Sequence, residues 1–329
     1  MRTCQPSLRV SLATMYFAVH VCMGVFGDRQ GLVNQLHDED VLRRLEVLEI
    51  KLNHFLNWNV NPRLGFTADP SLCRESTNLA KYGCKRPACP GLYDQFICLD
   101  NFPMGNCIVY DYGIREQPEF GRVMSLPPFN CHVYAFDPSP VATAWMKSSP
   151  EAAILRRNKR YHLMGYGAGR VNGDIDLYEY DWGQVSMINY PAFVQGAGQY
   201  SYPSQKKFQL PVRTLSHAMQ QLGHDHVDVV KLDVEGSEFG FLENAIDSGD
   251  CAKIDQLTLE WHHYTFDNRY GGASSPHINA IVAMLRRCGL HQYYVHDARG
   301  GWPQTGKMYY DMGMTLRYNL VAFVRPSVH

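Results

Sequence analysis

The stretch Val227-Asp-Val-Val-Lys-Leu-Asp-Val-Glu-Gly-Ser-Glu238 decides how the fold of this chain is interpreted. Its first half, residues 227–232, is rich in β-branched residues and predicts a strand buried on both faces of a sheet. Two acids, Asp233 and Glu235, follow this strand directly, and a helical pattern over residues 237–246 comes next. Acids at the carboxyl end of a buried strand, just before a helix, lie where open α/β sheets bind ligands. The stretch therefore predicts a ligand site.

Helix capping offers a second interpretation of the same residues. Ser237 and Glu238 could simply cap the helix, with Asp233 as a turn residue. Two acids and a glycine are more than a cap requires, which favours the ligand site.

Strand-like and helix-like segments alternate from Cys107 onward. Strands are expected at residues 107–112, 131–136, 227–232, 256–260, 290–295 and 320–325. Helices are expected at residues 141–157, 212–222, 237–246 and 276–288. Residues 161–180 are expected to form a strand, a loop and a second short strand, and residues 190–209 a long loop. This alternation predicts an α/β fold with a doubly wound, mostly parallel sheet.

Acids or a glycine follow three of these strands at matching places. They are Asp111 with Gly113, then Asp137, then Asp233 with Glu235. A glycine after the first strand lets the backbone approach a ligand, and an acid after the second can accept hydrogen bonds from both hydroxyls of a ribose. The sequence has no Gly-x-Gly-x-x-Gly motif, because arginine stands at position 115, so the prediction of a nucleoside site depends on the three places together.

Composition limits the classes of function. The chain has 329 residues, of which 45% are hydrophobic, and this suits one large domain with appendages or two small domains. The formal net charge of −1 provides no overall field that would attract nucleic acid or anionic lipid. A nucleic-acid partner is therefore not expected.

The cysteines predict disulfides. They are Cys4, Cys22, Cys73, Cys84, Cys89, Cys98, Cys107, Cys131, Cys251 and Cys288. Without the first two, an even number remains, which suits disulfides formed in an oxidising compartment. A zinc site is the alternative, but no Cys-x-x-Cys is present. The pairing stays open.

The N-terminal segment is typical of the secretory pathway. An apolar run over residues 10–26 follows two arginines and could be a cleaved signal peptide or an uncleaved signal anchor. A heptad-like seam over residues 38–56 predicts a short helical stalk that could form a homodimer. The expected parts are a signal peptide or anchor (1–27), a helical stalk (28–60), a Cys-rich lead-in (61–106) and the α/β domain (107–329). The expected location is the ER or Golgi lumen, held by a single membrane segment, or outside the cell.

From about Cys89 to Arg325 the chain resembles the FkbM-type family of S-adenosylmethionine-dependent methyltransferases, and within it the branch called methyltransferase-like protein 24. The resemblance rests on Val229-Val-Lys-Leu-Asp-Val-Glu-Gly-Ser-Glu238, which is close to the Lys-x-Asp-x-Glu-Gly signature of that family. Supporting stretches are Ile97-Cys-Leu-Asp100, Cys107-Ile-Val-Tyr-Asp-Tyr-Gly-Ile114, Val133-Tyr-Ala-Phe-Asp-Pro-Ser139 and Leu257-Thr-Leu-Glu-Trp-His262.

The resemblance implies a class I methyltransferase (Rossmann-like) fold and S-adenosylmethionine as the cofactor. Residues 111–113 (Asp111, Tyr112 and Gly113) would bind its methionine part, and Asp137 its ribose. The acceptor would be a hydroxyl of a sugar, lipid or small metabolite. Arg115, where relatives carry glycine, could pair with the cofactor carboxylate or block its approach.

Methyl transfer to a hydroxyl requires a base that removes its proton. Asp233, Glu235, Glu260 and His262 are the candidates, since adjacent parallel strands would bring them together. His262 is of the usual base type near neutral pH, and Glu260 could orient it. The same four side chains could instead hold a divalent cation, or His262 could lie on a polar surface at the strand exit.

Two other classes of function remain open. A luminal glycosyltransferase could use Asp174-Ile-Asp176, expected in a Gly-rich turn, to bind a metal and a nucleotide sugar. A non-catalytic binding module could keep the fold without the cofactor, and Arg115 favours this interpretation.

Overall fold

The protein is described from a computed structural model, and the description covers residues 68–79, 95–180, 184–186, 206–265, 276–297 and 315–326. The expected signal segment, the stalk with its heptad seam, and most of the expected 190–209 loop lie outside the described residues. In the part of the chain described, no helix is both long and apolar enough to cross a membrane.

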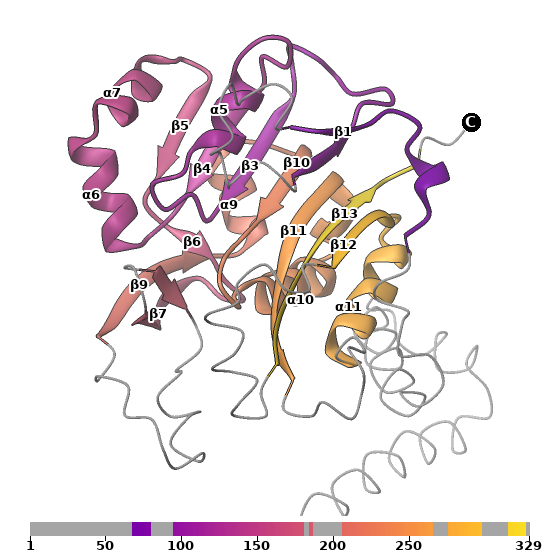
Figure 1. Cartoon of the computed structure of the whole chain (residues 1–329). Helices are drawn as coiled ribbons and strands as arrows, with labels where there is room; N and C mark the ends of the chain where they lie inside the picture. The colour runs from indigo at the N-terminus through magenta and orange to yellow at the C-terminus, as the bar shows by residue number, and fades with distance from the viewer. Residues whose placement is uncertain are drawn as a thin grey trace, which may run out of the picture. The chain divides into compact units, whose positions relative to one another are not determined.

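A seven-stranded sheet forms the centre of the domain (Figure 1). Its strands are β3 (Ile108–Tyr112), β4 (His132–Phe136), β5 (Tyr161–Met164), β10 (Val227–Leu232), β11 (Ile254–Thr265), β12 (His291–Asp297) and β13 (Thr315–Val324). The spatial order is β12-β13-β11-β10-β3-β4-β5, and only β13 runs antiparallel to its neighbours. This is the doubly wound order, with the last strand inserted beside the edge strand. The predicted class I methyltransferase-type α/β fold is confirmed.

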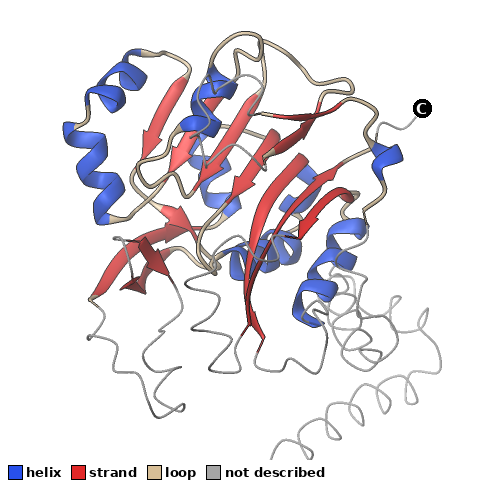
Figure 2. Ribbon diagram, viewed as in Figure 1, coloured by secondary structure: helices blue, strands red, loops and turns tan. Residues whose placement is uncertain are grey.

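Helices cover both faces of the sheet (Figure 2). They are α5 (Glu119–Ser125), α6 (Pro140–Ser148), α7 (Pro150–Arg157), α9 (Leu215–Leu222), α10 (Glu238–Ser248) and α11 (Pro276–Arg287), with 3₁₀ turns η2 (Pro70–Leu72) and η6 (Asp250–Lys253). Because both faces are covered, all six residues of β10 are buried, as its β-branched sequence predicts.

Two helix predictions need correction, and the capping alternative can be examined. The helix expected at 212–222 begins only at Leu215, because Val212 and Arg213 belong to a strand, β9 (Lys207–Arg213). The single helix expected at 141–157 is two helices, because Ser149 ends α6 and its hydroxyl accepts N–H groups at the start of α7, where Pro150 is the first residue. Ser237 makes no side-chain cap bond to α10; instead the N–H of Gly236 donates to Glu238 Oε2 (2.9 Å). Capping by Ser237 therefore does not explain the acids before α10.

A second, four-stranded sheet lies in the chain between β5 and β10. It consists of β6 (Gly167–Ala168), β7 (Gly173–Tyr180), β8 (Gln184–Ser186) and β9 (Lys207–Arg213) in the order β6-β9-β7-β8. Asp174 and Asp176 lie in β7, not in the expected turn, and Asp176 pairs with Lys207 (2.7 Å). Figure 1 shows β6, β7 and β9 beyond the carboxyl ends of β4 and β5, so this sheet can wall a site at that edge.

The Cys-rich lead-in packs against the large sheet. Its strands β1 (Ser76–Asn78) and β2 (Phe96–Cys98) pair antiparallel, and a disulfide joins Cys73 to Cys98. The side-chain amide of Gln256 in β11 exchanges two hydrogen bonds with the backbone of Cys98, both 2.8 Å long. The Phe96 ring stacks on Tyr294 in β12, with centroids 3.9 Å apart.

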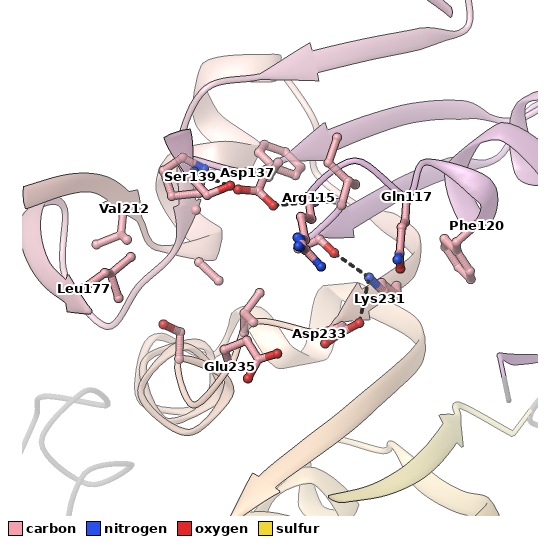
Figure 3. A pocket seen from close by; sticks show the side chains of 18 residues that line it. Arg115, Gln117, Phe120, Asp137, Ser139, Leu177, Val212, Lys231, Asp233 and Glu235 are labelled. Carbon is pink, nitrogen blue, oxygen red and sulfur yellow. Dashed lines mark hydrogen bonds and ion pairs between the residues drawn. The ribbon is translucent and has the colours of Figure 1, made fainter. Parts of the chain in front are cut away.

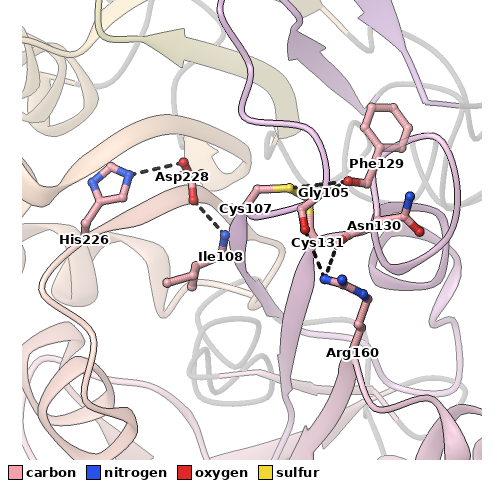
Figure 4. Close-up of a disulfide and its surroundings, with 9 residues drawn as sticks. All are labelled: Gly105, Cys107, Ile108, Phe129, Asn130, Cys131, Arg160, His226 and Asp228. Carbon is pink, nitrogen blue, oxygen red and sulfur yellow. Dashed lines mark hydrogen bonds and ion pairs between the residues drawn. A yellow bond between two sulfur atoms is a disulfide. The ribbon is translucent and has the colours of Figure 1, made fainter.

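Disulfides are confirmed for six cysteines: Cys73–Cys98, Cys107–Cys131 and Cys251–Cys288. Cys84 and Cys89 lie outside the described residues. The second disulfide joins the beginnings of β3 and β4 (Figure 4).

Polar contacts also fasten the edge of the sheet where the parallel strands begin. Asp228 Oδ2 accepts the N–H of Ile108 (2.6 Å), which links β10 to β3. Arg160 donates to the carbonyls of Gly105 (3.2 Å) and Asn130 (2.6 Å), as Figure 4 shows. The starts of the central strands are thus cross-linked.

Candidate active site

A cavity opens at the carboxyl ends of β3 and β10, where the strand order reverses (Figure 3). Its wall comes from the turn after β3 with Phe120 of α5, from the turn after β4, from the end of β10 with the turn that follows it, and from the small sheet. The switch point of a doubly wound sheet is the expected place for a ligand. Of the sequence-derived candidates, Gly113, Asp137, Asp233 and Glu235 lie in its wall.

Gly113 holds the turn after β3 against the end of β10. Its φ is +81°, and a Cβ added there would lie 1.6 Å from the carbonyl oxygen of Asp233. Its N–H donates to the carbonyl of Phe136 (2.9 Å), which ties the turn to β4 as well. Glycine is therefore required here by close contact between two backbone segments. The sequence analysis had expected it for a different reason, the close approach of a ligand.

Asp137 is held rigidly at the cavity. Its Oδ2 accepts the N–H of Arg115 (2.6 Å) and its Oδ1 the N–H of Ser139 (2.8 Å), and the residue is only 6% exposed. Each carboxylate oxygen can accept a second hydrogen bond. Two fixed acceptor oxygens therefore stand in the cavity wall.

Arg115 reaches Asp137 through an unusual backbone conformation. Its φ is +47°, a region that residues other than glycine and asparagine rarely adopt. Its side chain lines the cavity in Figure 3. Arg115 thus keeps the turn bonded to Asp137 through its backbone and adds a guanidinium to the cavity wall.

Lys231 is a buried cation between β3 and β10, with only 5% of its surface exposed. Its ammonium donates to the carbonyls of Tyr112 (3.2 Å) and Gly113 (3.0 Å). It also lies 3.5 Å from Asp111 Oδ1 and 3.7 Å from Asp233 Oδ2. Burial alone would lower the pKa of Lys231, but these carboxylates, with a smaller contribution from Glu260, outweigh it and raise the pKa.

Sequence reasoning assigned no role to Lys231. The signal was present, because a lysine inside an otherwise apolar, fully buried strand must find compensating partners.

Asp233 and Glu235 present two carboxyl groups at the cavity. Glu235 has φ +51° and Gly236 has φ +99°, so the chain turns sharply between β10 and α10. Backbone strain at a residue that is not glycine is concentrated at functional sites. This conformation brings Glu235 to the same cavity as Asp233.

Asp111 and Tyr112 lie beneath the cavity and are not part of its wall. Asp111 Oδ2 accepts the N–H of Gly121 in the first turn of α5 (3.1 Å). Burial raises the pKa of Asp111, and Lys231 opposes this shift. The Tyr112 ring stacks on Phe136, with centroids 4.3 Å apart. Both residues support the turn from below.

Glu260 and His262 lie in β11, beside β10, and the described wall of the cavity includes neither. In the antiparallel pairing of β11 with β13, Glu260 stands opposite Leu320 and His262 opposite Tyr318. The side chain of His262 is outside the description. The structure thus gathers Asp233 and Glu235 at the cavity without Glu260.

The far end of the cavity is apolar. Leu177 in β7 and Val212 in β9 are buried, and they line the cavity together with Ala168 and Pro138. Sequence reasoning missed this surface, because it did not predict the pairing of β6, β7 and β9.

Groups that could hold a metal ion occur elsewhere in the described residues. They are Cys73, Cys98 and Asp100, whose sulfurs form a disulfide, and His226, Asp228 and Asp255. Neither group includes Asp233, Glu235 or Glu260, so the described residues provide no metal cluster at the cavity.

Comparison with known proteins finds similarity in part of the chain. Residues 129–291 match the methyltransferase FkbM domain. This FkbM segment contains β4, the small sheet, β10 and the residues Asp137, Lys231, Asp233 and Glu235. The matched segment and the sheet order agree with a class I methyltransferase fold. No curated protein matches the chain.

Three solved structures are similar at low identity. Methyltransferase FkbM from Methylobacillus flagellatus KT is 14% identical, with 89% of this chain and 57% of that chain covered and a TM-score of 0.37. Fibrillarin of Aeropyrum pernix with natively bound S-adenosyl-L-methionine is 11% identical (67% and 67% covered, TM-score 0.34). TYW2 of M. jannaschii in complex with AdoMet is 12% identical (68% and 72% covered, TM-score 0.32). The chain thus spans little more than half of the first of these proteins.

Proposed function

We propose that the protein is an S-adenosylmethionine-dependent methyltransferase that methylates a hydroxyl group of a sugar, lipid or small metabolite. The observation that carries this proposal is Asp137, whose carboxylate is fixed by two backbone N–H groups in a cavity at the switch point of the sheet.

The nucleoside half of the cofactor fits the cavity by its chemistry. A ribose offers two neighbouring hydroxyl donors, and Asp137 offers two oriented oxygens that each keep acceptor capacity. The apolar surface of Leu177, Val212 and Pro138 suits the faces of an adenine ring.

The amino-acid half fits the opposite end. A methionine carboxylate and ammonium require groups of both signs, and Arg115 and Asp233 line this part of the cavity (Figure 3). The carboxylates of Asp233 and Glu235 also favour a cationic sulfonium. Both halves of the cofactor therefore find groups of suitable chemistry in the cavity wall.

When bound, the cofactor supplies an electrophilic methyl group. The chain's own part is to hold the acceptor hydroxyl in line and to take its proton. Asp233 and Glu235 are the proposed bases, because both reach the cavity. A helping role for Glu260 and His262 stays a prediction, since neither belongs to the described wall.

The cellular setting is part of the proposal. Three disulfides favour folding in an oxidising compartment, in agreement with the expected secretory location. Membership of the methyltransferase-like protein 24 branch, attachment through the N-terminal segment and a homodimer through residues 38–56 are further proposals.

Calorimetric titration with S-adenosylhomocysteine tests the cofactor. The unaltered protein should bind it, and Asp137→Asn should weaken binding by about tenfold or more, equivalent to about 1.4 kcal/mol. Asp225→Asn, the same change at an exposed acid before β10, should leave the affinity unchanged. Absence of binding by the unaltered protein would overturn the proposal.

Transfer itself is tested with methyl-labelled S-adenosylmethionine and a panel of hydroxyl-bearing glycans and lipids. If Glu235→Gln keeps the affinity for S-adenosylhomocysteine and loses labelled product, the enzyme is supported. Cofactor binding by the unaltered protein, with no product from any acceptor class, would favour the binding module instead.

A further inference from the structure

Lys231 connects the two parts of the site that approach the amino-acid end of the ligand. The ammonium bonds to two carbonyls of the turn after β3, at Tyr112 and Gly113, and faces the carboxylate of Asp233 at the end of β10. In the sheet, Lys231 stands opposite Asp111 in register. One cation thus joins a backbone turn, a buried acid and an acid of the cavity wall.

A buried ammonium is destabilising unless all of its partners are in place. The ammonium of Lys231 donates hydrogen bonds to two carbonyls at 3.2 and 3.0 Å, and two carboxylates lie within ion-pair distance at 3.5 and 3.7 Å. Moving the turn or Asp233 would leave this charge less well compensated. Lys231 therefore restricts both to one arrangement.

The nucleoside end is fixed by other contacts. Asp137 is held by the N–H groups of Arg115 and Ser139, and the apolar wall belongs to the small sheet. None of these bonds includes the ammonium of Lys231. The two ends of the cavity therefore depend on different contacts.

We infer that Lys231 is a positioning residue that sets recognition of the amino-acid half of the ligand by fixing the Gly113 turn against Asp233. This inference rests on the proposed function and deepens it. It predicts that loss of Lys231 weakens binding of S-adenosylhomocysteine much more than binding of adenosine, which lacks the amino-acid half.

The test uses the full chain and calorimetric titration with both ligands. Lys231→Met alone could unfold the protein, because it leaves Asp111 buried without its cation. The informative variant is therefore Lys231→Met combined with Asp111→Asn, which removes both buried charges while the new side-chain carbonyl can still accept the N–H of Gly121. Asp111→Asn alone is the matched control: it lowers stability through the lost ion pair, but it leaves Lys231 bonded to both carbonyls and facing Asp233, so the turn and β10 stay joined.

The double variant should bind S-adenosylhomocysteine about tenfold more weakly or worse, and adenosine within about threefold of the unaltered protein. The control should bind both ligands within about threefold. Lys231→Arg, which keeps the charge, should bind S-adenosylhomocysteine more tightly than the double variant and more weakly than the unaltered protein.

Normal binding of S-adenosylhomocysteine by the double variant would overturn the inference. An equal loss of both ligands would also overturn it, because that is the result of a purely structural role. If the unaltered protein bound neither ligand, the proposed function would fail first.

Discussion

The two edges of the large sheet are held together by different means. Where the parallel strands begin, a disulfide joins Cys107 to Cys131, and Asp228 bonds to the N–H of Ile108. Where they end, at the cavity, the chain relies on close backbone contact at Gly113 and on the buried charge of Lys231. A disulfide thus fixes the edge without the cavity, while polar side chains line the cavity at the other edge.

Backbone strain shows the same contrast. Four non-glycine residues in the described part of the chain have positive φ, and two of them, Asn101 and Asn130, are of the type that tolerates it. The other two, Arg115 and Glu235, line the cavity. Positive φ at residue types that rarely adopt it is thus found at the cavity, and such backbone strain is typical of functional sites.

The largest effect should come from Gly113→Ala. The new methyl group would meet the carbonyl of Asp233 at 1.6 Å, so the turn or β10 must move. We expect a loss of about 3 kcal/mol or more in the free energy of unfolding, together with loss of S-adenosylhomocysteine binding. Denaturant unfolding and titration measure the two effects.

Gly105→Ala is the matched control at the opposite edge. Gly105 has a similar φ of +88° with nothing within 4 Å of the added carbon, so only the conformational cost of about 1 kcal/mol should appear. Equal losses at both glycines would contradict the contact described at Gly113.

Removal of the Cys107–Cys131 disulfide should come next. The double change Cys107→Ser and Cys131→Ser should lower the free energy of unfolding by about 2–4 kcal/mol, because it frees a loop of the unfolded chain. The affinity for S-adenosylhomocysteine, measured on folded protein, should stay unchanged. A fall in affinity as large as that of Asp137→Asn would show that the two edges are not independent.

Asp250, close to the start of β11, should give a smaller and pH-dependent effect. Burial would raise its pKa, but hydrogen bonds from Lys253, Ser216 and Ser248 outweigh this and lower the pKa. The stabilisation is therefore present above the unfolded pKa of about 4 and is lost as pH falls through the lower folded value.

Asp250→Asn should accordingly cost about 1–2 kcal/mol at pH 7, and the difference from the unaltered protein should shrink below about pH 4. Unfolding curves at pH 7, 5 and 3 check this. A difference that grew toward acid would refute the assignment.

The smallest change in stability should follow Glu235→Gly, and it should be a gain. Glycine adopts φ near +51° without strain, so the free energy of unfolding should rise by up to about 1 kcal/mol. Methyl transfer should fall, because a cavity carboxylate is lost. A loss of stability would show that Glu235 is held by contacts that outweigh its backbone strain.

Sequence reasoning was most successful where a buried apolar run stands directly before acidic residues. The β-branched run before Asp233 predicted both β10 and the edge of the sheet on which the cavity lies. Strand and helix alternation predicted the doubly wound sheet, because each strand covered on both faces is a continuous apolar run.

It was least successful where tertiary contacts decide. Asp111 ends a strand, as a ligand-binding acid would, but the N–H of Gly121 in α5 and the ammonium of Lys231 draw it beneath the cavity. The pairing of β6 with β9 joins segments far apart in the chain, and no periodic pattern of apolar residues in either segment predicts it. Side-chain direction and long-range pairing are properties of the assembled domain.

The lead-in has a consequence for proteolysis. Residues 80–94 lie between β1 and β2, which are joined by strand pairing and by the disulfide Cys73–Cys98. Cleavage of any peptide bond in that interval would leave the two fragments joined by the disulfide. The backbone of Cys98 would also keep its two hydrogen bonds to the side-chain amide of Gln256. Such a nicked molecule would migrate as one species until a reducing agent separated it into two.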